Sequence, residues 1–71
     1  MSLFRKKRRA EIAKEIKDGG SDKLIAKKLG VPPSSVYVVR MKPGPDGRYS
    51  SGRPRTVEEL ELIIKEGGLT P

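Results

Sequence analysis

Arginine and lysine carry most of the chemistry that this sequence offers. Of the 71 residues, 16 are Lys or Arg and nine are Asp or Glu, so the formal net charge is +7. The cations are concentrated in the first 55 residues, because residues 56–71 hold one Lys against four Glu. Guanidinium and ammonium groups bind phosphates through charge and hydrogen bonds. The expected partner is therefore a polyanion, either nucleic acid or an acidic membrane face.

The residues needed for catalysis or metal binding are missing. The chain has no His and no Cys, which removes the commonest general base and the usual zinc ligands. The carboxylates are scattered, and most have a Lys or Arg at helical spacing, which indicates ion pairs. No nucleophile–base set and no phosphate-cradling loop is visible. We expect no enzyme activity, catalytic residue, metal site, cofactor or small-molecule substrate.

Composition narrows the class of protein further. Apolar residues make up 34% of the chain, so only a small core can form. No apolar run is long enough to span a membrane and no signal-peptide pattern is present. We therefore expect a cytoplasmic, nucleoid-associated protein with no membrane partner. Abundant Lys and Glu without Cys, Asn or Gln fits a high-temperature source.

The stretch from Asp22 to Met41 predicts two short helices that meet at a corner. Apolar residues recur four apart in its first half and three apart in its second half, which predicts helices over residues 22–29 and 33–42. Gly30 follows the first helix, where a left-handed residue is expected to end it. Ala26 supplies the small side chain that a steep crossing of the two helices needs.

The residues around this corner give further helix boundaries. Ser21 or Asp22 can cap the first of the two helices, and Pro32 or Pro33 can start the second. Pro43 is expected to end the second helix, because the residue before a proline avoids helical geometry.

The phase of the helix over residues 33–42 decides which side chains it shows to a partner. If Val36 and Val39 face inward, the opposite side carries small, aromatic and aliphatic residues, and Arg40 flanks the core. Such an outward helix face is what enters the major groove in helix-turn-helix proteins. The DNA-contacting residues predicted for these two helices are Lys23, Ser34, Ser35, Tyr37, Val38, Arg40, Met41 and Lys42.

A first helix is predicted over Leu3–Asp18, with an apolar stripe in its second half. Its beginning carries five consecutive cations, where the helix dipole disfavours them. Three interpretations stay open: a solvated first turn, a basic arm that gains order on phosphates, or a targeting signal. The residues of this arm are Arg5, Lys6, Lys7, Arg8 and Arg9.

Residues 43–55 are rich in Pro and Gly and show no apolar periodicity, so they are predicted to be an extended linker. Within it, Gly52-Arg53-Pro54-Arg55 resembles the core of an AT-hook. This resemblance implies that Arg53 and Arg55 enter a narrow A·T minor groove. The alternative is a flexible basic spacer.

Thr56 and Glu59 form a capping-box pattern that predicts a last helix from Val57 to Glu66. Residues 11–20 and 59–68 repeat at an offset of 48 residues, each ending in Gly-Gly. This helix is thus either the start of a truncated second helix-turn-helix, with Thr70-Pro71 as the next cap, or a terminal packing helix. Its apolar face must fold back on the first helices or pair with a second copy in a homodimer.

The order of a corner at Ala26 and Gly30, then Gly52-Arg53-Pro54-Arg55, then a capped helix resembles the N-terminal DNA-binding region of mariner-type transposases. It is also similar to the arm and helix of Hin-type invertases. The resemblance implies Ser34 to Met41 in the major groove and Arg53 with Arg55 in the minor groove. The outward helix face lacks the basic or amide residues that such proteins often place there.

The sequence therefore predicts an all-α protein with a three-helix helix-turn-helix domain over residues 1–42. An extended basic linker follows over 43–55, and one further helix lies within 56–71. The predicted function is a double-stranded DNA-binding module, either a small transcriptional regulator or the recognition part of a transposase or recombinase. A protein–protein adaptor that uses the third helix, and a basic RNA-binding protein, are the alternatives; few aromatic residues are available for stacking on RNA bases.

Overall fold

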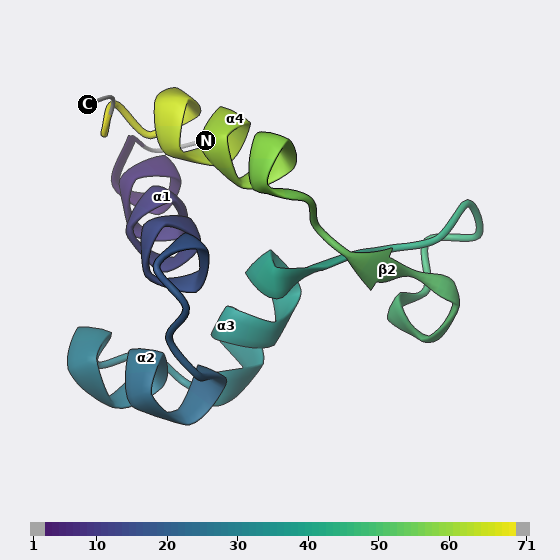
Figure 1. Ribbon diagram of the computed structural model, residues 1–71, viewed down its shortest axis with the longest axis horizontal. Coiled ribbons are helices and arrows are strands. Elements are labelled where there is room, and N and C mark those ends of the chain that lie inside the picture. The colour runs from purple at the N-terminus through teal and green to yellow at the C-terminus, as the bar shows by residue number, and fades with distance from the viewer. Residues whose placement is uncertain (1–2, 70–71) are drawn as a thin grey trace.

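Helices dominate the computed structural model, which describes residues 3–69, with side chains from Lys6 onward (Figure 1). The mostly helical class is confirmed, although a short β-ladder and one 3-10 turn are added to it. None of the helices in the described range has the length and hydropathy needed to cross a membrane. The elements are α1 (Leu3–Lys17), α2 (Asp22–Leu29), α3 (Pro33–Arg40), β1 (Met41–Lys42), η1 (Tyr49–Ser51), β2 (Arg53–Pro54) and α4 (Val57–Glu66).

The helix ends follow local chemistry closely. Ser21 caps α2 through its side chain, and Gly30 ends α2 with φ 69° and ψ 33°. That left-handed conformation costs a residue with a Cβ roughly 1–2 kcal/mol, so glycine suits the corner. Pro33 is the first residue of α3, where a proline removes no helical hydrogen bond. Thr56 and Glu59 form the complete capping box at the start of α4.

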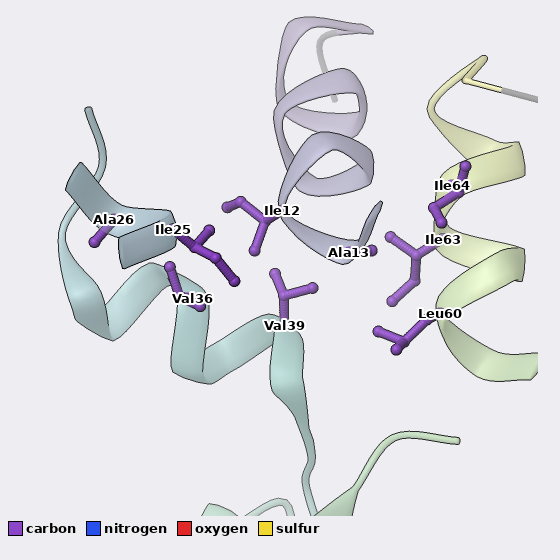
Figure 2. Close-up of a cluster of buried hydrophobic side chains, with 9 residues drawn as sticks. All are labelled: Ile12, Ala13, Ile25, Ala26, Val36, Val39, Leu60, Ile63 and Ile64. Atoms are coloured by element: carbon purple, nitrogen blue, oxygen red, sulfur yellow. The ribbon is translucent and has the colours of Figure 1, made fainter. Parts of the chain in front are cut away.

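One hydrophobic core joins all four of these helices, with α1 at its centre. In Figure 2, Ile12 of α1 points towards α2 and α3, whereas Ala13 lies on the side of α4. Among the described side chains, Ile25 and Val36 are the largest that are fully buried. The core cluster consists of Ile12, Ala13, Ile25, Ala26, Val36, Val39, Leu60, Ile63 and Ile64.

Helix α4 folds back on α1 and covers its own apolar face within the chain. Leu60, Ile63 and Ile64 are buried in the same cluster as Ile12 and Ala13. The end of α4 approaches α1 closely, because a Cβ on Gly67 would lie 2.3 Å from the Cβ of Ala10. Residues 56–69 thus share one core with the first three helices, and α4 does not need a second copy to bury Leu60, Ile63 or Ile64. The predicted cap at Thr70-Pro71 lies outside the described residues.

The extended linker predicted over residues 43–55 is wrong, and so is the predicted end of the third helix. Helix α3 stops at Arg40, two residues early, and Met41–Lys42 becomes strand β1. This strand pairs antiparallel with β2, with Met41 opposite Pro54 and Lys42 opposite Arg53. The backbone hydrogen bonds of the ladder replace those that two more helical residues would have made. The intervening chain projects from the helices as a loop (Figure 1).

Hydrogen bonds within the loop over residues 43–52 give it a defined shape. The Asp46 carboxylate accepts from the backbone N–H of Arg48 at 3.1 Å and from the Ser51 hydroxyl. The Gly44 N–H donates to the carbonyl of Arg48 at 3.0 Å. Such local bonds are typical of Asx turns. The segment between the strands is therefore a structured turn and not a free spacer.

Ala26 is the residue whose size should limit how closely α2 and α3 pack. It is buried, with 5% of its surface exposed, and it belongs to the same cluster as Val36. We expect Ala26→Leu to lower the free energy of unfolding by about 1–3 kcal/mol through overpacking. Urea unfolding followed by circular dichroism measures this, and an unchanged midpoint would show that the corner has room to spare.

Candidate nucleic-acid interface

The outward side of α3 carries an exposed aromatic and an exposed aliphatic residue. Val36 and Val39 are buried, whereas Tyr37 and Val38 keep 42% and 40% of their surface exposed. Ser34 is exposed and Ser35 is half-buried. Contiguous exposed apolar surface marks interaction sites when it is large. The predicted phase of this helix, with Val36 and Val39 facing inward, is confirmed.

Tyr49 extends this face from the loop. The rings of Tyr37 and Tyr49 lie 5.8 Å apart between centroids and are tilted by 49°, a separation typical of attractive aromatic pairs. The contact joins η1 to α3, so the loop stands beside the exposed helix face. Met41, predicted to lie on that face, is half-buried and belongs to β1.

The chain between Lys23 and Arg55 is almost free of negative charge. It holds eight Lys or Arg residues and a single carboxylate, Asp46. The hydrogen bond from Ser51 and that from the Arg48 backbone lower the pKa of Asp46, and both bonds lie within the loop. Among the described side chains, Lys23, Lys27 and Arg48 form no ion pair. These three cations are available to an external anion.

Two predicted DNA-contacting arginines serve the fold instead. The Arg40 guanidinium donates to the Asp22 carboxylate and, at 2.9 Å, to the carbonyl of Gly20. The Arg55 Nε donates at 2.9 Å to the carbonyl of Val39, one of the terminal α3 carbonyls that lack a helical partner. Burial lowers the pKa of Arg55, and the charge of Arg9 lowers it further. Arg55 still stays cationic at neutral pH.

The basic arm predicted at the start of the chain is part of helix α1. Arg8 is half-buried and donates at 2.9 Å to the carbonyl of Leu29, at the C-terminal end of α2. Lys6, Lys7 and Arg9 are exposed. Arg5 lies in α1, and its side chain falls outside the described part. The interpretation of a separate arm is therefore wrong for Arg8, which joins two helices.

The remaining predicted cations, Lys42 and Arg53, share one carboxylate. Arg53 donates to both Glu59 oxygens, at 2.8 and 3.2 Å, and the Lys42 ammonium lies 3.1 Å from Glu59 Oε2. The hydrogen bonds from Arg53, the Thr56 backbone and Lys42 hold the pKa of Glu59 far below its ordinary value of 4.5. Arg53 is thus fixed to α4 and does not lie on a free, extended arm.

The structure therefore brings together only part of the predicted site. Ser34, Tyr37 and Val38 share one face, and Lys23 lies on the neighbouring helix α2. Sequence reasoning missed Tyr49 and Glu59, whose roles depend on how the loop folds back. The single aromatic residue in an otherwise polar linker was the available signal for Tyr49.

Comparisons with protein-family models, with curated proteins and with solved structures returned no significant match.

Arg55 should stabilise the end of α3. We expect Arg55→Ala to lower the free energy of unfolding by about 1–2 kcal/mol, because a terminal carbonyl loses a charged donor. Arg48→Ala is the matched control: Arg48 is exposed and forms no ion pair among the described residues, so its effect should stay within about 0.5 kcal/mol. Equal losses in thermal unfolding would contradict the role of Arg55.

Glu59 should contribute a pH-dependent part of the stability. Its pKa in the folded chain is lowered from 4.5, so its contribution is complete above pH 4.5 and is lost as the pH falls below that value. On acidification from about pH 5 to about pH 3, we expect wild type to lose more stability than Glu59→Gln. Parallel stability–pH curves for the two proteins would be the opposite result.

Proposed function

We propose that this chain is a double-stranded DNA-binding module in which α2, the corner at Gly30 and α3 act as a helix-turn-helix. The observation that carries the proposal is the exposed face of α3, with Tyr37 at 42% and Val38 at 40% exposure. Unpaired cations occur on α2 and in the loop, on the two segments that flank α3 in the chain. A convex helix beside positive charge fits the major groove of a duplex.

The affinity of this module comes mainly from phosphates. Lys23, Lys27 and Arg48 supply side chains without an ion-pair partner among the described residues, and each neutralised phosphate steepens the dependence on salt. Ser34 can donate a hydrogen bond to a phosphate or a base edge, and Val38 can contact a thymine methyl. The α3 face offers no Asn, Gln or Arg for a bidentate base contact, so discrimination by α3 alone is modest.

Of the two arginines that were predicted to contact DNA next to the last helix, Arg53 is the one that remains accessible to it. Its side chain is 55% exposed and is held by a surface carboxylate, whereas Arg55 is fixed to α3 by its side chain and by its backbone N–H, which donates to Arg40. Of the two arginines, Arg53 can therefore reach DNA without breaking a contact to the helix core. A role in transcription regulation, or in recognition by a transposase or recombinase, fits such a module.

A protein adaptor is the second candidate, because the exposed rings and aliphatic side chains of α3 also fit an apolar partner surface. The two functions differ in their response to salt. DNA binding should weaken steeply between low and physiological ionic strength, whereas docking on an apolar face should change little.

Val38→Glu tests the interface directly. A carboxylate on the outward face of α3 should repel phosphates and lower the affinity for duplex DNA about tenfold or more, with little change in stability, because Val38 is exposed. Leu62→Glu is the matched control: Leu62 is 60% exposed on α4, and the substitution makes the same change in charge. Fluorescence anisotropy with a labelled duplex measures both variants.

The comparison of the two variants separates the outcomes. A large loss for Val38→Glu and a small one for Leu62→Glu supports α3 as the contact. Equal losses would mean that only net charge matters, and an unmodified chain without DNA affinity would contradict the proposed function.

A further inference from the structure

Lys42 and Arg53 face each other across the β-ladder, and their like charges should push the two strands apart. They are register partners in the antiparallel pair of β1 and β2. Side chains of directly opposite residues lie on the same face of a ladder, where like charges destabilise it. An anion between them removes this penalty. In the folded chain that anion is the carboxylate of Glu59, from the first turn of α4.

Arg53 binds the Glu59 carboxylate with the two-point geometry that arginine also uses to bind phosphate. Its two terminal nitrogens each donate to one carboxylate oxygen, at 2.8 and 3.2 Å, and this two-point arrangement suits phosphate oxygens equally well. Lys42 adds a second cation, 3.1 Å from Oε2. Two cations therefore converge on one pair of oxygens.

The site is open to solvent. The side chains of Lys42 and Arg53 are 50% and 55% exposed, whereas that of Glu59 is 20% exposed. Both cations also line an open groove of about 480 Å³ along the base of the loop, although Glu59 is not among its lining residues. A larger anion can reach the two cations from outside without entering the core. The other residues that line the groove are Pro43, Gly44, Pro45, Ser51 and Gly52.

Charge around the pair also favours an external anion. Lys42 and Arg53 carry two positive charges against the single charge of Glu59, so the group keeps a net charge of +1. The positive charge of Arg55 is close enough to interact with this group, since the charges of Glu59 and Arg53 both influence the pKa of Arg55. No other described carboxylate forms an ion pair with Lys42 or Arg53.

We propose that Lys42 and Arg53 form a binding site for one backbone phosphate of duplex DNA, and that Glu59 occupies this site until DNA displaces it. This inference rests on the proposed DNA-binding function and names a regulating residue for it. Competition by Glu59 lowers the affinity of the wild-type chain for DNA, because the internal ion pairs of Glu59 must break before the phosphate binds. Glu59 also keeps the ladder closed in the absence of DNA.

Glu59→Gln is the decisive variant, because it removes the charge and keeps the shape. Glutamine at this position still accepts the backbone N–H of Thr56, so the capping box of α4 is retained. We expect this variant to bind duplex DNA about three- to tenfold more tightly than wild type, measured by fluorescence anisotropy at constant salt. Circular dichroism on the same samples monitors the fold.

Glu58→Gln controls for net charge. Glu58 precedes Glu59 in the first turn of α4, is exposed, and forms no ion pair among the described residues. Removal of its charge should raise the affinity much less than Glu59→Gln does. Arg53→Ala provides the second comparison: in this background, Glu59→Gln should lose most of its effect, because the displaced partner is gone.

The possible results test the displacement of Glu59 by phosphate separately from DNA binding itself. Equal gains for Glu59→Gln and Glu58→Gln, or a loss of affinity in a folded Glu59→Gln variant, would overturn the displacement by phosphate while leaving DNA binding intact. No DNA binding by wild type and both variants would overturn the proposed function itself. Saturation of the site by inorganic phosphate alone, followed by NMR of Lys42 and Arg53, would make it a small-anion site and overturn its assignment to DNA.

Discussion

Helix α1 is buried on two sides, and the positions of the other helices depend on it. Ile12 packs towards α2 and α3 while the adjacent Ala13 faces α4 (Figure 2), so the core passes around α1 instead of lying along one stripe. A chain of this length buries a smaller share of its surface than a large domain does, and few contacts can be spared. The position of α3 therefore depends on α1, which packs against α4 as well (Figure 2).

Arginine side chains provide the second constraint, because the core is too small to fix the helix ends alone. Arg8 donates to the end of α2, and Arg55 to the end of α3. Arg40 ties the end of α3 to the segment just before α2. Each guanidinium satisfies a carbonyl that has no helical partner and brings positive charge to the negative end of a helix dipole or to a carboxylate. Part of the high positive charge thus serves the fold and not the partner.

Features that depend on residues close together in the sequence were predictable, whereas features that depend on contacts between distant segments were not. The corner at Gly30 and the cap at Thr56 depend on neighbouring residues, so the sequence predicted both. Strands of two residues have no periodicity to detect, and the β-ladder was missed for that reason. The phase of α3 was predicted from two valines, whereas the contact of Tyr37 with Tyr49 depends on the path of the loop. The partners of the arginines likewise arise only when distant segments meet.

Glu59 stands where the acidic and basic parts of the chain meet, and it performs three tasks with one carboxylate. It accepts the N–H of Thr56, it binds Arg53 at two points, and it offsets the like charges of Lys42 and Arg53. The first task needs only an acceptor oxygen, whereas the other two need a negative charge. Substitution of Glu59 by glutamine and by alanine should therefore have different effects. Glutamine keeps the capping hydrogen bond at the start of α4 and releases the two cations, whereas alanine releases the cations and also weakens the helix start. Helix α4 carries most of the exposed carboxylates among the described residues. Glu59, in its first turn, is the one whose charge opposes the binding of an external anion by Arg53.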